Sequence, residues 1–244
     1  MSERIALYAG TRNLYHDMVV ACKSLIYHDG ADRVIFLIED DTFPEKLPPC
    51  VTTVNVVDQT IFPRTGPNYT CRWTYMALMR CGLTKLFPDI DRILTLDVDT
   101  IVNKRIDFLW DLDMTDYYFA AVEENQIVHR IHPYFNFGVV MHNLAKLRSD
   151  GTDDVIIRSI NSSWFAYPEQ DAMNSVCRHY TYSLPQEFNA MWFNKPQLPP
   201  SEARIIHYAN TAEPFCKKPY YASYENAPWD TIISQRHCVG GGME

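Results

Sequence analysis

Two carboxylates follow an apolar run near the middle of the chain. Residues 93–96 are typical of a buried strand, and Asp97 and Asp99 come directly after it, with Val98 between them. Ligands of open α/β sheets bind at the carboxyl ends of strands, and two carboxylates there suit a hard divalent cation that also holds phosphates. An ordinary polar strand end is the alternative. Because burying two carboxylates without a cation is costly, we keep both interpretations.

Polar residues interrupt two further apolar segments. Asn136 and Gly138 lie inside the stretch 134–144. An amide suits sugar hydroxyls, whereas a glycine within a strand indicates either close approach by a ligand or another backbone segment, or a β-bulge. His207 ends the short run 204–207. Such a histidine is more often a core or rim residue, although an imidazole also completes an Mn²⁺ site that carboxylates begin.

Three consecutive polar residues follow Pro168. Glu169, Gln170 and Asp171 stand at the start of a predicted helix, since proline at the first helical position followed by acids is typical of a helix N-terminus. Helix capping explains this composition as well as ligand binding does, so the segment alone does not separate the two.

The elements that must position these residues alternate between strands and helices, which predicts an α/β fold with a central, mostly parallel sheet flanked by helices. The first strand-to-helix turn, residues 10–15, is where such folds often hold a nucleotide, yet it has neither the dinucleotide glycine motif nor a P-loop. The predicted strands are 5–9, 34–38, 51–57, 92–96, 117–122, 135–141 and 204–207, and the predicted helices are 14–27, 72–86, 153–160 and one beginning near residue 168.

Composition narrows the class of protein. The chain has 244 residues, with 22 Lys and Arg against 30 Asp and Glu, a net charge of −8. This balance argues against a nucleic-acid partner, and no stretch reaches the roughly 20 apolar residues of a membrane span. Seven cysteines without a C-x-x-C pair and a polar start without a signal-peptide pattern favour a cytoplasmic protein. We expect one domain over residues 1–239 and a flexible tail over 240–244.

The order of these segments resembles glycosyltransferase family 8, retaining enzymes of the GT-A fold that include glycogenin and bacterial lipopolysaccharide galactosyl- and glucosyltransferases. The resemblance runs from about Ile5 to Phe215. The segments that carry it are Leu96-Asp97-Val98-Asp99-Thr100, Phe135-Asn136-Phe137-Gly138-Val139, Gln170-Asp171-Ala172-Met173-Asn174 and His207-Tyr208.

The resemblance implies a single Rossmann-like GT-A domain, a UDP-glucose or UDP-galactose donor and a bridging Mn²⁺, with Mg²⁺ as a substitute. By position it makes Asp97, Asp99 and His207 the metal ligands. Asp97 and Val98 also lie on the donor side, and Gln170 is expected to orient the sugar, with Asp171 the second choice as a nucleophile. It places the uridine at Gly10, Thr11, Asn13 and Tyr15, and the donor sugar and phosphates at Arg80 (less strongly Arg72), Glu124, Asn136, Glu169 and Gln170.

The chain departs from the family pattern after the metal histidine. Several members carry a glycine and then a diphosphate-binding lysine there, whereas this chain has Asn210 and Glu213. Lys217 or Lys218 is the candidate replacement. The basic, aromatic membrane segment of some lipopolysaccharide enzymes is also absent, which leaves peripheral membrane contact open.

The implied function is a retaining hexosyltransferase that acts on a glycan or other hydroxyl acceptor, with a lipid-linked glycan as one candidate. Two alternatives remain from the residues, a metal-dependent sugar nucleotidyltransferase and a non-catalytic nucleotide-sugar binding module. Segments 62–68 and 186–200 are candidate acceptor walls. Their aromatic residues Phe188, Trp192 and Phe193 either stack on a sugar ring or pack beneath the loop.

Overall fold

A seven-stranded sheet forms the centre of the computed structural model. The structure describes residues 3–70, 74–124, 133–193, 196–209 and 213–239, and residues 237–239 are described by their backbone alone. The strand order is β3-β2-β1-β4-β7-β6-β8. Its strands are β1 (Ile5–Ala9), β2 (Arg33–Ile38), β3 (Val51–Asn55), β4 (Arg92–Leu96), β6 (Phe119–Glu123), β7 (Phe135–Asn143) and β8 (Thr181–Ser183).

The sheet is mixed but mostly parallel. Strand β1 pairs in parallel with β2 and β4, and β2 with β3, while β7 runs antiparallel to both β4 and β6. Strand β8 is parallel to β6. The predicted α/β sheet is therefore confirmed. The antiparallel β7 matters for the site, because it brings its own first residues to the edge where β4 ends.

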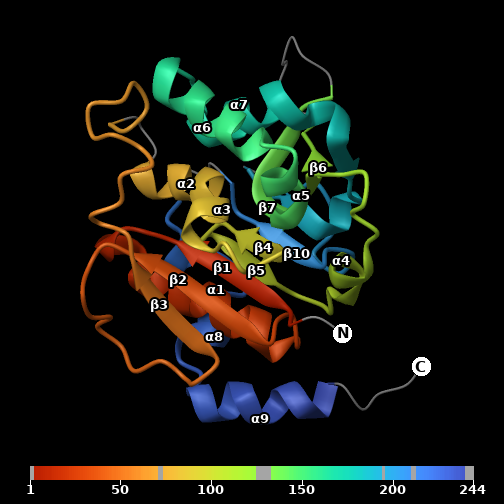
Figure 1. Cartoon of the computed structure of the whole chain (residues 1–244). Coiled ribbons are helices and arrows are strands. Elements are labelled where there is room, and N and C mark those ends of the chain that lie inside the picture. Colours follow the sequence, from red (N-terminus) through yellow and green to blue (C-terminus); the bar gives the residue numbers. More distant parts are fainter. Residues whose placement is uncertain (1–2, 71–73, 125–132, 194–195, 210–212, 240–244) are drawn as a thin grey trace.

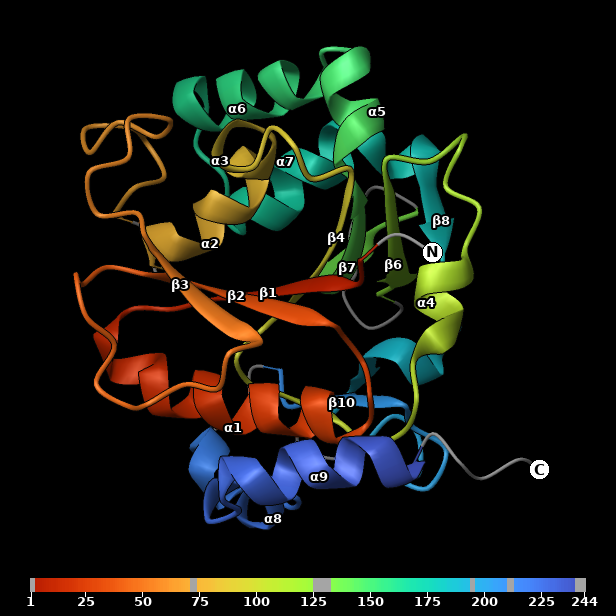
Figure 2. The same ribbon diagram turned by 60° about the horizontal axis from the view of Figure 1, so that its bottom comes forward.

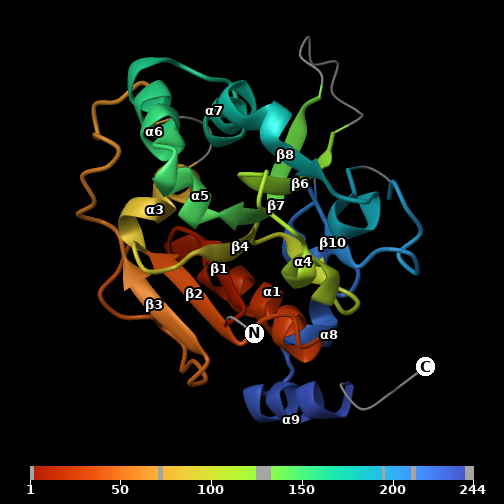
Figure 3. The same cartoon turned by 45° about the vertical axis from the view of Figure 1, so that its right-hand side comes forward.

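Helices cover both faces of this sheet (Figures 1 and 2). One face carries α1 (Tyr15–Tyr27), with α8 (Tyr221–Glu225) and α9 (Trp229–Val239) beyond it, and the other face carries α2, α3 and α5–α7 (Figure 3). Two apolar cores result, one on each side. The remaining helices are α2 (Tyr75–Met79), α3 (Leu83–Leu86), α4 (Asp107–Asp111), α5 (Leu144–Ser149), α6 (Thr152–Ser162) and α7 (Pro168–Cys177).

A second sheet of three short strands lies beside the end of β4. Its order is β5 (Thr100–Val102), β10 (Ile205–His207) and β9 (Ala190–Met191). Strand β10 is antiparallel to β5 and parallel to β9. The sequence predicted β10 but missed β5 and β9, because strands of two or three residues show no periodicity.

The predicted helix 72–86 is wrong as a single element. Over the described residues it is α2, a 3₁₀ turn at Arg80–Gly82 and then α3. Gly82 weakens the helix interior, and a 3₁₀ stretch inside a helix often marks a functional position. This turn carries Arg80.

The other predicted elements are present with small shifts at their ends. Strand β3 stops at Asn55 instead of residue 57, because the Asn55 side chain accepts a hydrogen bond from the Val57 amide at 2.9 Å and turns the chain. None of the described helices combines the length and apolar character needed to cross a membrane.

Candidate metal and donor site

The turn between β4 and β5 carries the two aspartates. The Thr100 backbone amide and hydroxyl both donate to the carbonyl oxygen of Asp97, at 3.3 and 2.7 Å, which holds the turn closed. His207 pairs with Thr100 across the β10–β5 ladder, and the Tyr208 amide donates to the Asp99 carbonyl at 3.0 Å. Two strands 105 residues apart in the chain are thereby locked together at this point.

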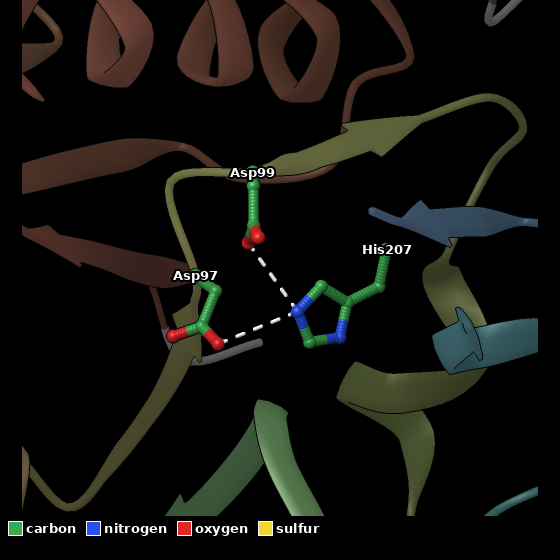
Figure 4. Close-up of side chains that lie close together, drawn as sticks. All are labelled: Asp97, Asp99 and His207. Atoms are coloured by element: carbon green, nitrogen blue, oxygen red, sulfur yellow. Dashed lines mark ion pairs between the residues drawn. The ribbon is translucent and has the colours of Figure 1, made fainter. Parts of the chain in front are cut away.

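Asp97, Asp99 and His207 converge on one point (Figure 4). Nε2 of His207 lies 3.4 Å from Oδ2 of Asp97 and 3.3 Å from Oδ1 of Asp99. One ligand atom of each residue lies within 4.8 Å of the others. Two carboxylate oxygens and one imidazole nitrogen form a donor set that fits Mn²⁺ or a similar divalent cation.

Gly138 leaves the space that this cluster occupies. A Cβ atom at this position would lie 2.2 Å from Cε1 of His207 and 2.9 Å from Oδ2 of Asp97. The glycine therefore allows close approach, as its position in a strand suggested. The β6–β7 register also shifts opposite this part of β7, between Ala120 and Val122, so an irregular pairing and a close approach occur together.

Arg80 lies behind the cluster, where it is 8% exposed. Its guanidinium contacts Asp97 Oδ1 at 2.8 Å and Glu169 Oε2 at 2.6 Å, and donates to the Phe137 carbonyl at 3.0 Å. Burial opposes its charge, but Asp97 and Glu169 outweigh burial and raise the pKa of Arg80. Arg80 therefore stays charged and holds Asp97 in place.

The pKa values of the two carboxyl groups that contact Arg80 shift in opposite directions. Burial alone would raise the pKa of Asp97, but Arg80 and His207 together lower it. Burial raises the pKa of Glu169 to about 7, because the single contact with Arg80 does not offset its desolvation. For His207, burial lowers the pKa, but Asp99 and Asp97 outweigh burial and raise it.

A second polar group, expected on the sugar side of the donor, gathers next to the aspartates. The Gln170 side-chain oxygen accepts from the Phe137 amide at 3.0 Å, and its nitrogen donates to Glu124 Oε2 at 3.3 Å. Asn136 donates to the same Glu124 oxygen at 3.3 Å. The structure therefore brings Glu124, Asn136 and Gln170 together.

Asp171 serves the start of helix α7. Its Oδ1 accepts from the Tyr134 hydroxyl at 2.6 Å and its Oδ2 from the Tyr167 amide at 2.9 Å. Both oxygens are thus engaged, and the second bond satisfies one of the backbone donors that a helix start leaves unpaired.

The turn expected to hold uridine lies at the carboxyl end of β1, beside β4. The Gly10 amide donates to the Leu37 carbonyl at 3.2 Å, and the Thr11 hydroxyl donates to Asn13 Oδ1 at 2.7 Å. Tyr15 is 2% exposed, and its hydroxyl accepts from the Glu39 amide at 2.8 Å. Tyr15 therefore also fixes the end of β2.

The expected replacements for the diphosphate lysine are placed in part. The Lys218 ammonium contacts Glu213 at 3.2 Å, and Lys217 is exposed. Arg72, the weaker candidate for the donor sugar and phosphates, and Asn210, which stands in place of the family's glycine, lie outside the described residues.

The aromatic residues of segment 186–200 mostly pack against the protein. Phe188 is buried, stacks on Phe108 at 5.3 Å between ring centroids and lies beneath Arg204. Trp192 is half-buried against Tyr208, at 5.3 Å between centroids. The packing interpretation is therefore confirmed for Phe188.

One polar residue of the site was not found from the sequence. Asn189 is fully buried and bonds both Asn136 and His207, at 2.8 and 2.9 Å. An amide inside the apolar stretch 188–191 was the available signal, of the same kind that singled out Asn136.

The chain combines an α/β fold with two aspartates and a histidine gathered at the carboxyl edge of its sheet. Comparison with solved structures identifies this fold as the GT-A fold of glycosyltransferases. The galactosyltransferase LgtC, solved with donor and acceptor sugar analogues, superposes with a TM-score of 0.65 over 93% of this chain and 98% of that chain, at 20% identity. The sequence profile of glycosyl transferase family 8 matches residues 19–216. The chain belongs to this family.

More similar sequences are found among bacterial proteins. The chain is 29% identical over 199 residues to a Haemophilus influenzae protein, a match that covers 75% of this chain and 56% of that protein. It is 27% identical over 184 residues to lipopolysaccharide 1,2-glucosyltransferase of Escherichia coli K12, covering 63% of this chain and 53% of that enzyme. The aligned part thus spans little more than half of either relative.

Proposed function

We propose that the protein is a retaining hexosyltransferase that moves glucose or galactose from a UDP-sugar to a hydroxyl of a glycan, with Mn²⁺ or Mg²⁺ at Asp97, Asp99 and His207. The observation that carries the proposal is the juxtaposition of these three ligands with the amide and carboxylate group of Glu124, Asn136 and Gln170. One group suits a diphosphate-bound cation and the other suits sugar hydroxyls. Family membership supports transfer of a glycosyl group.

The bound cation would act as a Lewis acid that stabilises the charge developing on the diphosphate leaving group. Arg80 holds Asp97 ionised and oriented for this task. Gln170 lies fixed between the Phe137 amide and Glu124. Because an amide is a poor nucleophile, we assign Gln170 to orienting the sugar and stabilising its oxocarbenium-like state. The departing phosphate oxygen then takes the acceptor proton on the same face.

Asp171 is the weaker choice for a covalent nucleophile. Its two oxygens are engaged by Tyr134 and Tyr167, so attack on the anomeric carbon requires it to break one of these bonds. Because we assign Gln170 to stabilising the oxocarbenium-like state, Gln170→Ala should reduce the rate of transfer more than the affinity for the donor.

The acceptor and location are proposed at the level of class. We propose a sugar of a lipid-linked or surface polysaccharide as acceptor, in the cytoplasm. The similarity to a lipopolysaccharide glucosyltransferase supports this class.

The test compares Asp99→Ala with Asp116→Ala, an exposed aspartate on another surface. Calorimetric titration with a panel of nucleotide sugars, with and without Mn²⁺, should show metal-dependent binding of one UDP-hexose by the native protein and by Asp116→Ala. Asp99→Ala should lose both this binding and turnover. Intact turnover in Asp99→Ala would refute the proposal.

Two activity assays beside this titration separate the alternatives. Metal-dependent donor binding without transfer to any glycan acceptor would favour a binding module. Pyrophosphate release from UTP and a sugar phosphate would favour a nucleotidyltransferase.

A further inference from the structure

A backbone amide fixes the direction of a buried hydrogen-bond chain. The Gly138 N–H donates to the Asn136 side chain at 2.9 Å. A backbone amide can only donate, so the Asn136 atom that it reaches is the oxygen. The other end of Asn136 is then its NH₂ group, which points to the Glu124 carboxylate, an acceptor. The two ends agree, and the orientation of Asn136 follows from the network.

The same argument fixes the orientation of the Asn189 amide and places a hydrogen on His207. Asn189 contacts Asn136 Oδ1 at 2.8 Å, so it presents its NH₂ group there and its oxygen to Nδ1 of His207, at 2.9 Å. Because that oxygen is an acceptor, Nδ1 of His207 must carry a hydrogen. Nε2 is then the ring nitrogen that remains for a cation, and it is the one that faces Asp97 and Asp99.

We propose that Asn189 is a positioning residue that fixes the tautomer and ring orientation of His207 for cation binding. Metal-binding histidines generally donate their second N–H to an outer partner, and loss of that partner typically weakens metal binding 10- to 100-fold. Asn189 is fully buried, so water does not readily replace it. This inference rests on the proposed cation site.

This series of hydrogen bonds also joins the two halves of the proposed donor site. Asn136 belongs to the group expected around the sugar, and His207 to the group expected around the cation. Asn189 is the residue that bonds both. Its removal should therefore weaken cation binding through His207, while Asn136 loses one hydrogen bond and keeps those with the Gly138 amide and Glu124.

The experiment measures Mn²⁺ affinity without turnover, from the electron paramagnetic resonance signal of the free ion. Asn189→Ala should raise the dissociation constant roughly 10- to 100-fold. Asn189→Asp keeps an acceptor for the Nδ1 hydrogen but loses the donor to Asn136 Oδ1, so it should recover part of the affinity. If Asn189→Ala does not fold, Asn189→Ser gives the same comparison, since the serine side chain is too short to reach Nδ1 of His207.

The matched control is Asn68→Ala. Asn68 is equally buried and bonds the backbone of Ile160, Ser163 and Phe165. This variant should lose thermal stability while its Mn²⁺ affinity stays unchanged. An unchanged affinity in Asn189→Ala, or an equal loss in Asn68→Ala, overturns the inference. Absence of Mn²⁺ binding by the native protein would instead refute the proposed cation site itself.

Discussion

Gly138 offers a direct test of the crowding around the candidate metal ligands. In Gly138→Ala the new methyl carbon meets the His207 ring at 2.2 Å and Asp97 at 2.9 Å, distances that real atoms do not tolerate. One ligand must move, so cation affinity should fall roughly tenfold or more, as it does when ligand orientation is lost. Titration with Mn²⁺ measures the change.

The control for this variant is Gly151→Ala. Gly151 has a φ of 66° and no atom within 4 Å of an added Cβ, so the substitution costs on the order of 1 kcal/mol of stability through backbone strain. Its cation affinity should match that of the native protein. Equal affinities for all three proteins would show that His207 and Asp97 have room to spare.

At the scale of elements, His142 and Thr95 join strands β4 and β7 within the core. Nε2 of His142 lies 2.9 Å from the Thr95 hydroxyl. Burial, and then the charge of Arg80, lower the pKa of His142 to about 3. Below a pH of about 6.5, His142 binds a proton in the unfolded chain but stays neutral in the folded chain. Stability should therefore fall with pH from 6.5 toward 3, by up to about 1.4 kcal/mol per pH unit.

Chemical denaturation at pH 7.5 and pH 5 measures this contribution by difference. His142→Gln should be less stable than the native protein at pH 7.5, because the packing and the Thr95 contact change. It should nevertheless lose less stability between the two pH values. Parallel losses in the two proteins would contradict the assignment.

Elements buried on both faces were the easiest to predict. Strands β1, β2 and β4 are mostly apolar, and all but one residue of each is buried. Their types and positions were therefore evident from composition alone. The prediction of a single helix over 72–86 was wrong because apolar periodicity does not show the break at Gly82. There the 3₁₀ turn that carries Arg80 ends, and α3 follows it.

The site was predictable where polar residues interrupt apolar runs, and less so elsewhere. Asp97, Asp99 and His207 stand at strand ends and do converge. Asn189 was missed because the apolar stretch around it, residues 188–191, is too short to indicate a strand, and its 3₁₀ turn, Gln186–Asn189, begins with two polar residues. Only the fold shows that this turn places an amide between Asn136 and His207.

At the scale of the whole molecule, polar contacts hold the C-terminal helices against α1 and the turn that follows it. The Tyr221 hydroxyl donates to Asp17 at 2.9 Å, and Lys23 donates to the Glu225 carbonyl at 3.1 Å. On α9, Arg236 contacts Asp29 at 2.8 Å and Asp32 at 3.2 Å. These contacts join α8 to α1, and α9 to the turn between α1 and β2.

Arg236→Gln should lower the free energy of unfolding by about 1 kcal/mol at low salt, the usual upper value for partly exposed ion pairs. The loss should shrink in 1 M NaCl, because salt screens such pairs. Urea denaturation at both salt concentrations measures it. Arg158→Gln, at an exposed position on α6, should change stability by less at either concentration, and a salt-independent loss in Arg236→Gln would argue for packing instead of charge.

The small sheet has a consequence for synthesis on the ribosome. Its middle strand, β10, comes last in the chain, after both β5 and β9. Until β10 has emerged, β5 and β9 lack the partner that lies between them, and the aspartates of the β4–β5 turn lack their imidazole. Long-range pairings of this kind form late. A nascent chain therefore carries its two aspartates for more than one hundred residues of translation before it can complete the candidate metal-ligand set. Under the proposed function, metal binding then follows the folding of β10.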